Sequence, residues 1–172
     1  IGMRTLAEMP MREAVRKPYI IYGYMWSNSI RVADRQSLQE QGLLPRAKWT
    51  AVSDASVSSQ LQAGEEIFRV ACQSCHTVQG YNGIRLMVRG WSRPLIRYSL
   101  DHLDELKGYM PPFAGNHAER EALADWLRSL AGPMSVSATE SVARRLQVPP
   151  AVWAQLPGGV STGTPAAAGG KP

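Results

Sequence analysis

The sequence predicts an all-α protein. Apolar residues recur at spacings of three and four over 57–71, 92–103 and 118–130, which is the pattern of one buried face on a helix. Glycine and proline residues bound these segments. The chain has no long alternation of apolar and polar residues, the pattern of a half-buried strand. Helices joined by loops are therefore the expected architecture.

Composition divides the 172 residues into three regions. Residues 1–56 are basic and aromatic, and their prolines prevent long helices, so we expect an extended N-terminal arm with one short helix at 33–41. Residues 57–133 contain helical patterns bounded by glycine and proline residues, as expected of a compact domain. Residues 134–172 form an irregular Pro/Gly/Ala-rich tail with one short helix expected at 139–146. Such a composition buries too little apolar surface to fold alone, so we expect the tail to lie against a partner.

The first helix of the central domain is expected to approach another helix closely. Its predicted face comprises Val57, Leu61, Gly64, Phe68 and Ala71. A glycine inside a helix costs about 1 kcal/mol relative to alanine. A second helix that crosses closely at Gly64 would explain this choice, and the last helix of the domain is the candidate.

A middle helix is expected to begin at Ser92-Arg93-Pro94 and to end at Gly108. Its apolar side comprises Ile96, Leu100 and Leu103. The last helix begins at Asn116, which forms a capping pattern with Glu119 three positions later, and Gly132-Pro133 ends it. Its apolar stripe comprises Ala118, Ala122, Leu123, Trp126, Leu127 and Leu130.

The net charge of +5 lies in the flanks of the chain. Residues 1–49 carry eight Lys or Arg and four Asp or Glu, whereas residues 57–133 carry eight of each. Nucleic-acid binding requires a basic stripe on the folded unit, so we do not expect that function. The N-terminal excess suits an anionic membrane surface or an acidic protein partner.

The longest nearly uncharged apolar run, residues 18–26, is far shorter than the ~20 residues that span a bilayer. Its four aromatic residues are costly to leave in water, so we expect this segment to lie against an apolar surface. No signal-like pattern follows Ile1, and we expect a processed chain or a part of a longer one.

The strongest chemical signal is Cys72-Gln73-Ser74-Cys75-His76, which contains both cysteines of the chain. Two thiols at this spacing can add to the two vinyl groups of a haem, and the next residue places an imidazole under the iron. A thioredoxin-like C-x-x-C would follow a strand rather than a helical pattern. A zinc site would need a second ligand pair, and His102 and His117 lack that spacing. The motif therefore predicts one covalently bound haem c on Cys72 and Cys75.

A second motif, MPPFAG, begins at Met110 after the middle helix. With Gly64-x-x-Ile67-Phe68, CQSCH and the aromatic Trp126, it makes residues 64–131 resemble class I c-type cytochromes. The resemblance implies a small helical domain around the haem, with His76 as the proximal iron ligand and Met110 as the distal one. A thioether is a soft, neutral ligand, and Met/His ligation raises the reduction potential.

Other assignments for the sixth ligand stay open. Met110 could instead be a gap-filling core residue, and His102 could complete a bis-histidine site, although we expect it to be partly exposed. Met87 is close to the motif and is expected to pack. Many class I members carry a proline soon after the haem histidine, which this chain lacks, so a backbone carbonyl near 83–84 is expected to accept from the imidazole. The short interval from His76 to Met110 implies that one connecting helix is reduced.

Further haem contacts are expected from the segment between the two motifs. Arginines recur every four residues at Arg85, Arg89, Arg93 and Arg97, with Trp91 among them. Arg89, Arg93 and Trp91 are candidate partners of the haem propionates, because the guanidinium fork suits carboxylates. The alternative is an ordinary solvated face. The expected wall of the haem pocket comprises Tyr81, Leu86, Leu95 and Phe113.

The resemblance implies an electron carrier rather than an enzyme. We expect one-electron transfer within a membrane-associated respiratory or photosynthetic complex on the periplasmic or an equivalent extracytoplasmic side, with complex subunits and redox proteins as partners. A haem enzyme or gas sensor would need a labile Met110, and a mainly structural subunit would use the arm and tail to hold its neighbours. Residues 11–31 carry a second, shorter resemblance to an outer-side segment of bd-type quinol oxidases and related cytochrome b-like membrane proteins.

Overall fold

The computed structural model describes residues 22–50, 52–56, 59–106, 108–133 and the isolated positions 137, 144 and 147–149. Its helices are α2 (Arg35–Gln41), α3 (Gln60–Ala71), α4 (Ile84–Met87), α5 (Arg93–Asp101), α6 (Leu103–Leu106) and α7 (His117–Leu130), with 3-10 turns η1 (Val32–Asp34) and η2 (Leu44–Arg46). The described residues contain isolated bridges but no strand, so the all-α prediction is confirmed. In the same part of the chain, no helix combines the length and apolar character that crossing a membrane requires. Residues 1–21 lie outside the description, as does the helix expected at 139–146 apart from the isolated position 144.

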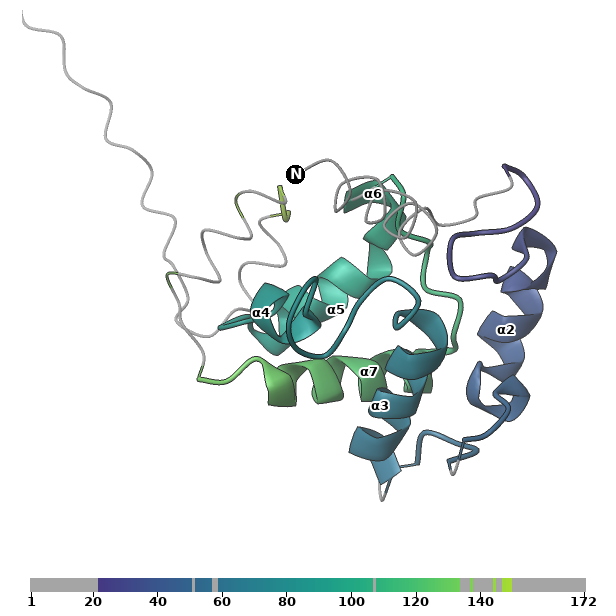
Figure 1. Ribbon diagram of the computed structural model, residues 1–172, viewed down its shortest axis with the longest axis horizontal. Coiled ribbons are helices and arrows are strands. Elements are labelled where there is room, and N and C mark those ends of the chain that lie inside the picture. The colour runs from purple at the N-terminus through teal and green to yellow at the C-terminus, as the bar shows by residue number, and fades with distance from the viewer. Residues whose placement is uncertain are drawn as a thin grey trace, which may run out of the picture.

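Helix α3 crosses α7 at Gly64, as the sequence predicts (Figure 1). A Cβ atom at Gly64 would lie 2.6 Å from Trp126 Cβ and would overlap the Ala122 carbonyl. Beside the crossing, the rings of Phe68 and Trp126 pack with centroids 4.9 Å apart. The buried residues of α3 are Ala63, Gly64, Ile67 and Phe68. Leu61, predicted on this face, is 53 % exposed because it lies about a quarter turn from the centre of the face.

Helix α7 begins with the predicted capping box. The Asn116 side chain accepts from the Glu119 N–H at 2.9 Å, and the Glu119 carboxylate accepts from the Asn116 N–H at 3.0 Å. The buried residues of α7 are Glu119, Ala122, Leu123, Ala124, Trp126 and Leu127. Ala118, predicted in the stripe, is exposed and lines an open pocket beside the N-terminal segment.

The predicted middle helix is two helices. Ser92 caps α5 as expected. The helix ends well before Gly108, because His102 has left the helical conformation with φ −127°. His102 Nδ1 lies 2.8 Å from the Tyr98 carbonyl and the two rings stack with centroids 4.2 Å apart. The single turn of α6 follows this break.

Glu119 draws the N-terminal segment into the core. Its carboxylate accepts hydrogen bonds from the Leu43 N–H at 2.7 Å and the Leu44 N–H at 2.8 Å. Leu38, Leu43 and Leu44 are at most 5 % exposed and belong to the same apolar cluster as α3 and α7. Gly42 has φ +91°, and a Cβ there would lie 2.7 Å from Glu119 Oε1, so glycine meets both constraints. The helix expected at 33–41 is observed as α2, and part of the predicted arm packs on the domain.

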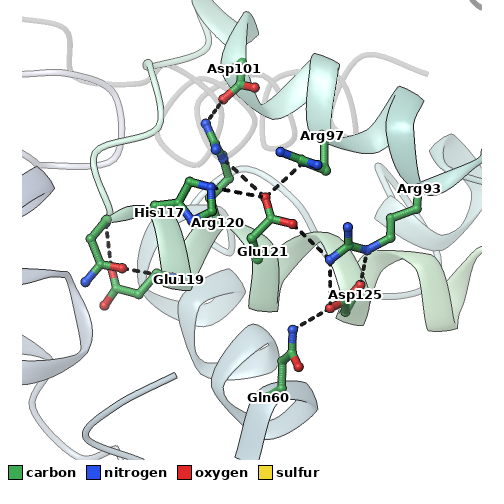
Figure 2. A network of polar contacts seen from close by, with 10 residues as sticks. Gln60, Arg93, Arg97, Asp101, His117, Glu119, Arg120, Glu121 and Asp125 are labelled. Carbon is green, nitrogen blue, oxygen red and sulfur yellow. Dashed lines mark hydrogen bonds and ion pairs between the residues drawn. The ribbon is translucent and has the colours of Figure 1, made fainter. Parts of the chain in front are cut away.

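Ion pairs join α5 to α7 (Figure 2). Glu121 lies 2.9 Å from both Arg93 and Arg97, and Asp125 accepts from Arg93 and Gln60. The Arg93 and Arg97 side chains are 39 % and 40 % exposed. Pairs of this exposure contribute about 1 kcal/mol or less each, so they set the orientation of α5 more than they stabilise the fold.

We expect Gly64→Ala to lower the free energy of unfolding of the holoprotein by about 2 kcal/mol, because the added methyl group overpacks the α3–α7 crossing. This loss exceeds the gain of up to ~1 kcal/mol in helix propensity. Gly108→Ala is the matched control, since nothing lies within 4 Å of a Cβ at Gly108. Equal denaturation midpoints for the two variants would contradict the close crossing.

We expect Glu119→Gln to lower the free energy of unfolding by about 2 kcal/mol, since hydrogen bonds to a charged acceptor are the stronger class and the amide would turn a donor toward backbone N–H groups. Chemical denaturation followed by circular dichroism measures this change. Glu105→Gln, at an exposed position of α6, is the control. A loss no larger than that of the control would show that the carboxylate is not the anchor of the N-terminal segment.

Candidate haem site

A cavity of about 480 Å³ opens at the C-terminal end of α3. Its lining comes from Ala71–Thr77, Tyr109–Ala114, Tyr81, Asn82, Met87 and Leu103, with Ser27 and Asn28 from the N-terminal segment. The lining is mainly apolar, and the volume lies within the range of about 300–1,000 Å³ typical of ligand and cofactor pockets. Both predicted motifs therefore line the same cavity.

The C-x-x-C-H motif forms a tight turn that leaves α3. The Cys72 carbonyl accepts from the Cys75 N–H at 3.0 Å and from the His76 N–H at 2.9 Å. This turn places both thiols and the imidazole in the lining of the same cavity. Burial, with a smaller contribution from the neighbouring Cys75, raises the pKa of the Cys72 thiol to about 12. The cavity therefore holds Cys72 as an uncharged thiol when no haem is attached.

The His76 ring has a buried nitrogen without a partner. Its Nδ1 atom makes no hydrogen bond, and burial lowers the pKa of the imidazole, while the backbone of Asn82 acts in the opposite direction. A neutral imidazole is the form that binds a metal, and a ligating histidine normally donates its other N–H to a nearby acceptor. The Asn82 backbone is the nearest candidate, one residue before the position expected from the sequence. The Asn82 side chain also donates to the Cys75 carbonyl and holds this loop against the motif.

The Met110 loop forms the wall that follows α6 and leads into α7. Met110 and Pro111 are half-buried, whereas Pro112 and Ala114 are buried. The structure thus brings Met110 to the cavity that holds Cys72, Cys75 and His76. Met87 reaches the same cavity but is 40 % exposed at its rim. His102 is absent from the lining, and its Nδ1 lies beside the Tyr98 carbonyl.

The predicted wall residues divide into two groups. Phe113 lies in the cavity wall, and Tyr81 lies at the rim with 68 % of its surface exposed. Leu86 and Leu95 do not line the cavity. Leu86 is 66 % exposed on α4, and Leu95 is fully buried in the core of the helical domain. Leu95 therefore packs in the core rather than in the pocket wall.

Two members of the arginine series, Arg93 and Arg97, pair with α7 and do not line the cavity. Arg93 lies beside Asp125 and Glu121 of α7, and these partners raise the pKa of its guanidinium, with Asp125 giving the largest effect (Figure 2). Arg89 and Trp91 are likewise not among the residues that line the cavity. The contact of Arg89, Arg93 or Trp91 with haem propionates stays a prediction.

Ser27 and Asn28 are site residues that the motifs did not indicate. Ser27 Oγ donates to the Tyr109 carbonyl, and Asn28 Nδ2 donates to the Ala71 carbonyl, both at 3.3 Å. These contacts join positions separated by 82 and 43 residues. No local sequence pattern predicts a contact between residues so far apart in the chain.

Residues 59–127 match the family model described as cytochrome c oxidase, cbb3-type, subunit III. No curated protein and no solved structure gives a significant match to the chain. Domains of the matched family bind covalently attached haem c, and the cavity offers two thiols, an unpartnered imidazole and an apolar wall for that group. Residues 59–127 are therefore a c-type cytochrome domain.

Proposed function

We propose that this domain transfers single electrons through a haem c attached at Cys72 and Cys75 and ligated by His76 and Met110. The observation that carries the proposal is the convergence of these four residues on one cavity, although they come from two loops more than 30 residues apart. Bound haem iron supplies a one-electron couple, and the protein sets its potential and exposure.

The residues around the four proposed anchors have separate tasks. The turn after α3 brings both thiols to the cavity, where they would bond the haem vinyl groups, and the Asn82 loop beside His76 would orient the imidazole ring. Pro111 and Pro112 reduce the conformational freedom of the Met110 loop, so the sulfur keeps its position in both oxidation states. Phe113, Ala114 and Leu103 exclude water from the cavity.

We further propose that the domain serves a membrane-associated respiratory or photosynthetic complex on the periplasmic or an equivalent extracytoplasmic side. Its family's description as an oxidase subunit supports a complex of this kind. The excess of basic residues in 1–49 suits an acidic partner or an anionic lipid surface. Tyr81 and Tyr109, 68 % and 62 % exposed at the cavity rim, suit contact with a redox partner.

Met110→Leu tests the sixth ligand. We expect the thioether-to-iron charge-transfer band of the ferric protein to disappear and the reduction potential to fall by about 100 mV or more, a fraction of the ~0.8 V that axial ligands span. Met87→Leu removes a sulfur from the same cavity and should leave both properties unchanged. Optical redox titration of the holoprotein measures them.

Two results would contradict the proposed ligand set. The band could persist in Met110→Leu and vanish in Met87→Leu, which would move the ligand to Met87. Alternatively, the ferrous wild-type protein could bind carbon monoxide at full occupancy, which would indicate an open or labile position and favour a haem enzyme or gas sensor.

Serine substitution tests the covalent attachment. We expect Cys72→Ser and Cys75→Ser each to retain haem through one thioether bond and the double variant to retain none. Mass spectrometry of the denatured protein distinguishes these states, because a covalent haem stays with the chain. Ser74→Ala, between the two cysteines, is the control. Covalent haem on the double variant would refute the assignment.

A further inference from the structure

The segment before α2 forms a small hairpin at the mouth of the haem cavity. The Val32 N–H donates to the Tyr24 carbonyl at 2.8 Å, and the Trp26 N–H donates to the Ile30 carbonyl at 2.9 Å. At the tip, Asn28 Oδ1 accepts from the Ile30 N–H at 3.3 Å. This hairpin, residues 24–32, lies outside the stretch that matches the family model.

Two consecutive tip residues contact the two loops of the site. Asn28 donates to the carbonyl of Ala71, the residue before Cys72. Ser27 donates to the carbonyl of Tyr109, the residue before Met110. Ala71 ends α3, where helix carbonyls have no partner within the helix, so the Asn28 amide supplies a donor that the helix cannot.

The hairpin also faces the Met110 loop. A second cavity of about 300 Å³ separates the two and is lined by Met25, Trp26 and Ser27 on one side and by residues 108–112 on the other. The hairpin in turn rests on α2, since the Arg35 guanidinium lies 6.0 Å from the centre of the Trp26 ring. The hairpin therefore connects the anchored N-terminal segment to both loops of the site.

We propose that Ser27 and Asn28 form a clamp that holds the Met110 loop at a fixed distance from the C-x-x-C-H turn. They are positioning residues, and their role rests on the proposed ligation by Met110. By this proposal, the clamp lowers the fraction of holoprotein molecules in which the Met110 thioether is not bound to the iron. An added ligand such as imidazole can bind the iron only in these molecules, so its apparent affinity rises with their fraction. The affinity therefore reports how strongly the clamp holds the Met110 loop.

The test is imidazole titration of the ferric holoprotein, with the full chain in every variant. Ser27→Ala removes one bond. Asn28→Ser shortens the side chain so that it no longer contacts the Ala71 carbonyl, but it keeps a side-chain oxygen that can accept from the Ile30 N–H. Both bonds are 3.3 Å long, which is longer than ordinary hydrogen bonds of their types, so we expect modest effects: imidazole should bind about twofold more tightly in each variant and about fourfold in the double variant. The reduction potential should fall in the same order.

Ser129→Ala is the control, because that hydroxyl donates to the Trp126 carbonyl of its own helix and its removal should leave the affinity unchanged. Wild-type affinity in the double variant, together with tighter binding in Met110→Ala, would overturn the clamp and leave the ligand set intact. Wild-type affinity in Met110→Ala would overturn the ligand set and the clamp together. Circular dichroism verifies that the variants keep their helices, so a change in affinity reports the site.

Discussion

The close approach of α3 and α7 at Gly64 is the constraint on which the site depends. At this point the two helices are so near that a methyl group would meet the Ala122 carbonyl and Trp126. Each helix carries one half of the site at its end. The C-x-x-C-H turn follows α3 directly, and the Met110 loop leads into the capping box of α7. The crossing therefore sets the relative position of the two loops before any cofactor is considered.

The capping box gives Glu119 a second task. A buried carboxylate is costly unless its oxygens are hydrogen-bonded, and the Asn116, Leu43 and Leu44 N–H groups meet that need. One side chain thus fixes the start of α7 and the path of the N-terminal segment. That segment then presents the hairpin to the cavity mouth, so the N-terminal packing and the geometry of the site are mechanically connected.

Local patterns in the sequence predicted much of this fold. Capping, glycine placement and the four-three periodicity located α2, α3, α7 and the start of α5, because each depends on residues a few positions apart. The end of α5 escaped prediction, since the stacking of His102 on Tyr98 replaces continued helix there. The contacts of Ser27 and Asn28 escaped for a different reason: they are side-chain bonds to distant carbonyls, which any backbone presents regardless of its sequence.

The arginine series shows that one sequence periodicity is compatible with two different binding partners. A spacing of four places charges on one helix face, and a haem propionate and a neighbouring acidic helix satisfy that face equally well. Glu121 and Asp125 also lie four apart, so the acidic face of α7 meets the basic face of α5, with Arg93 beside both acids and Arg97 beside Glu121. Periodicity alone therefore identifies a charged face but not its counterpart.

The folded domain includes residues outside the segment that matches the family model. About 70 residues make a marginal core, because a small domain leaves a large share of its surface in water. Leu38, Leu43 and Leu44 add three almost fully buried side chains to that core, each worth about 1.5–3 kcal/mol of apolar burial at most. An electron carrier needs a cofactor environment that does not rearrange as charge arrives and leaves. The N-terminal segment enlarges the core and reaches from it to both loops of the site, which suits the proposed electron transfer.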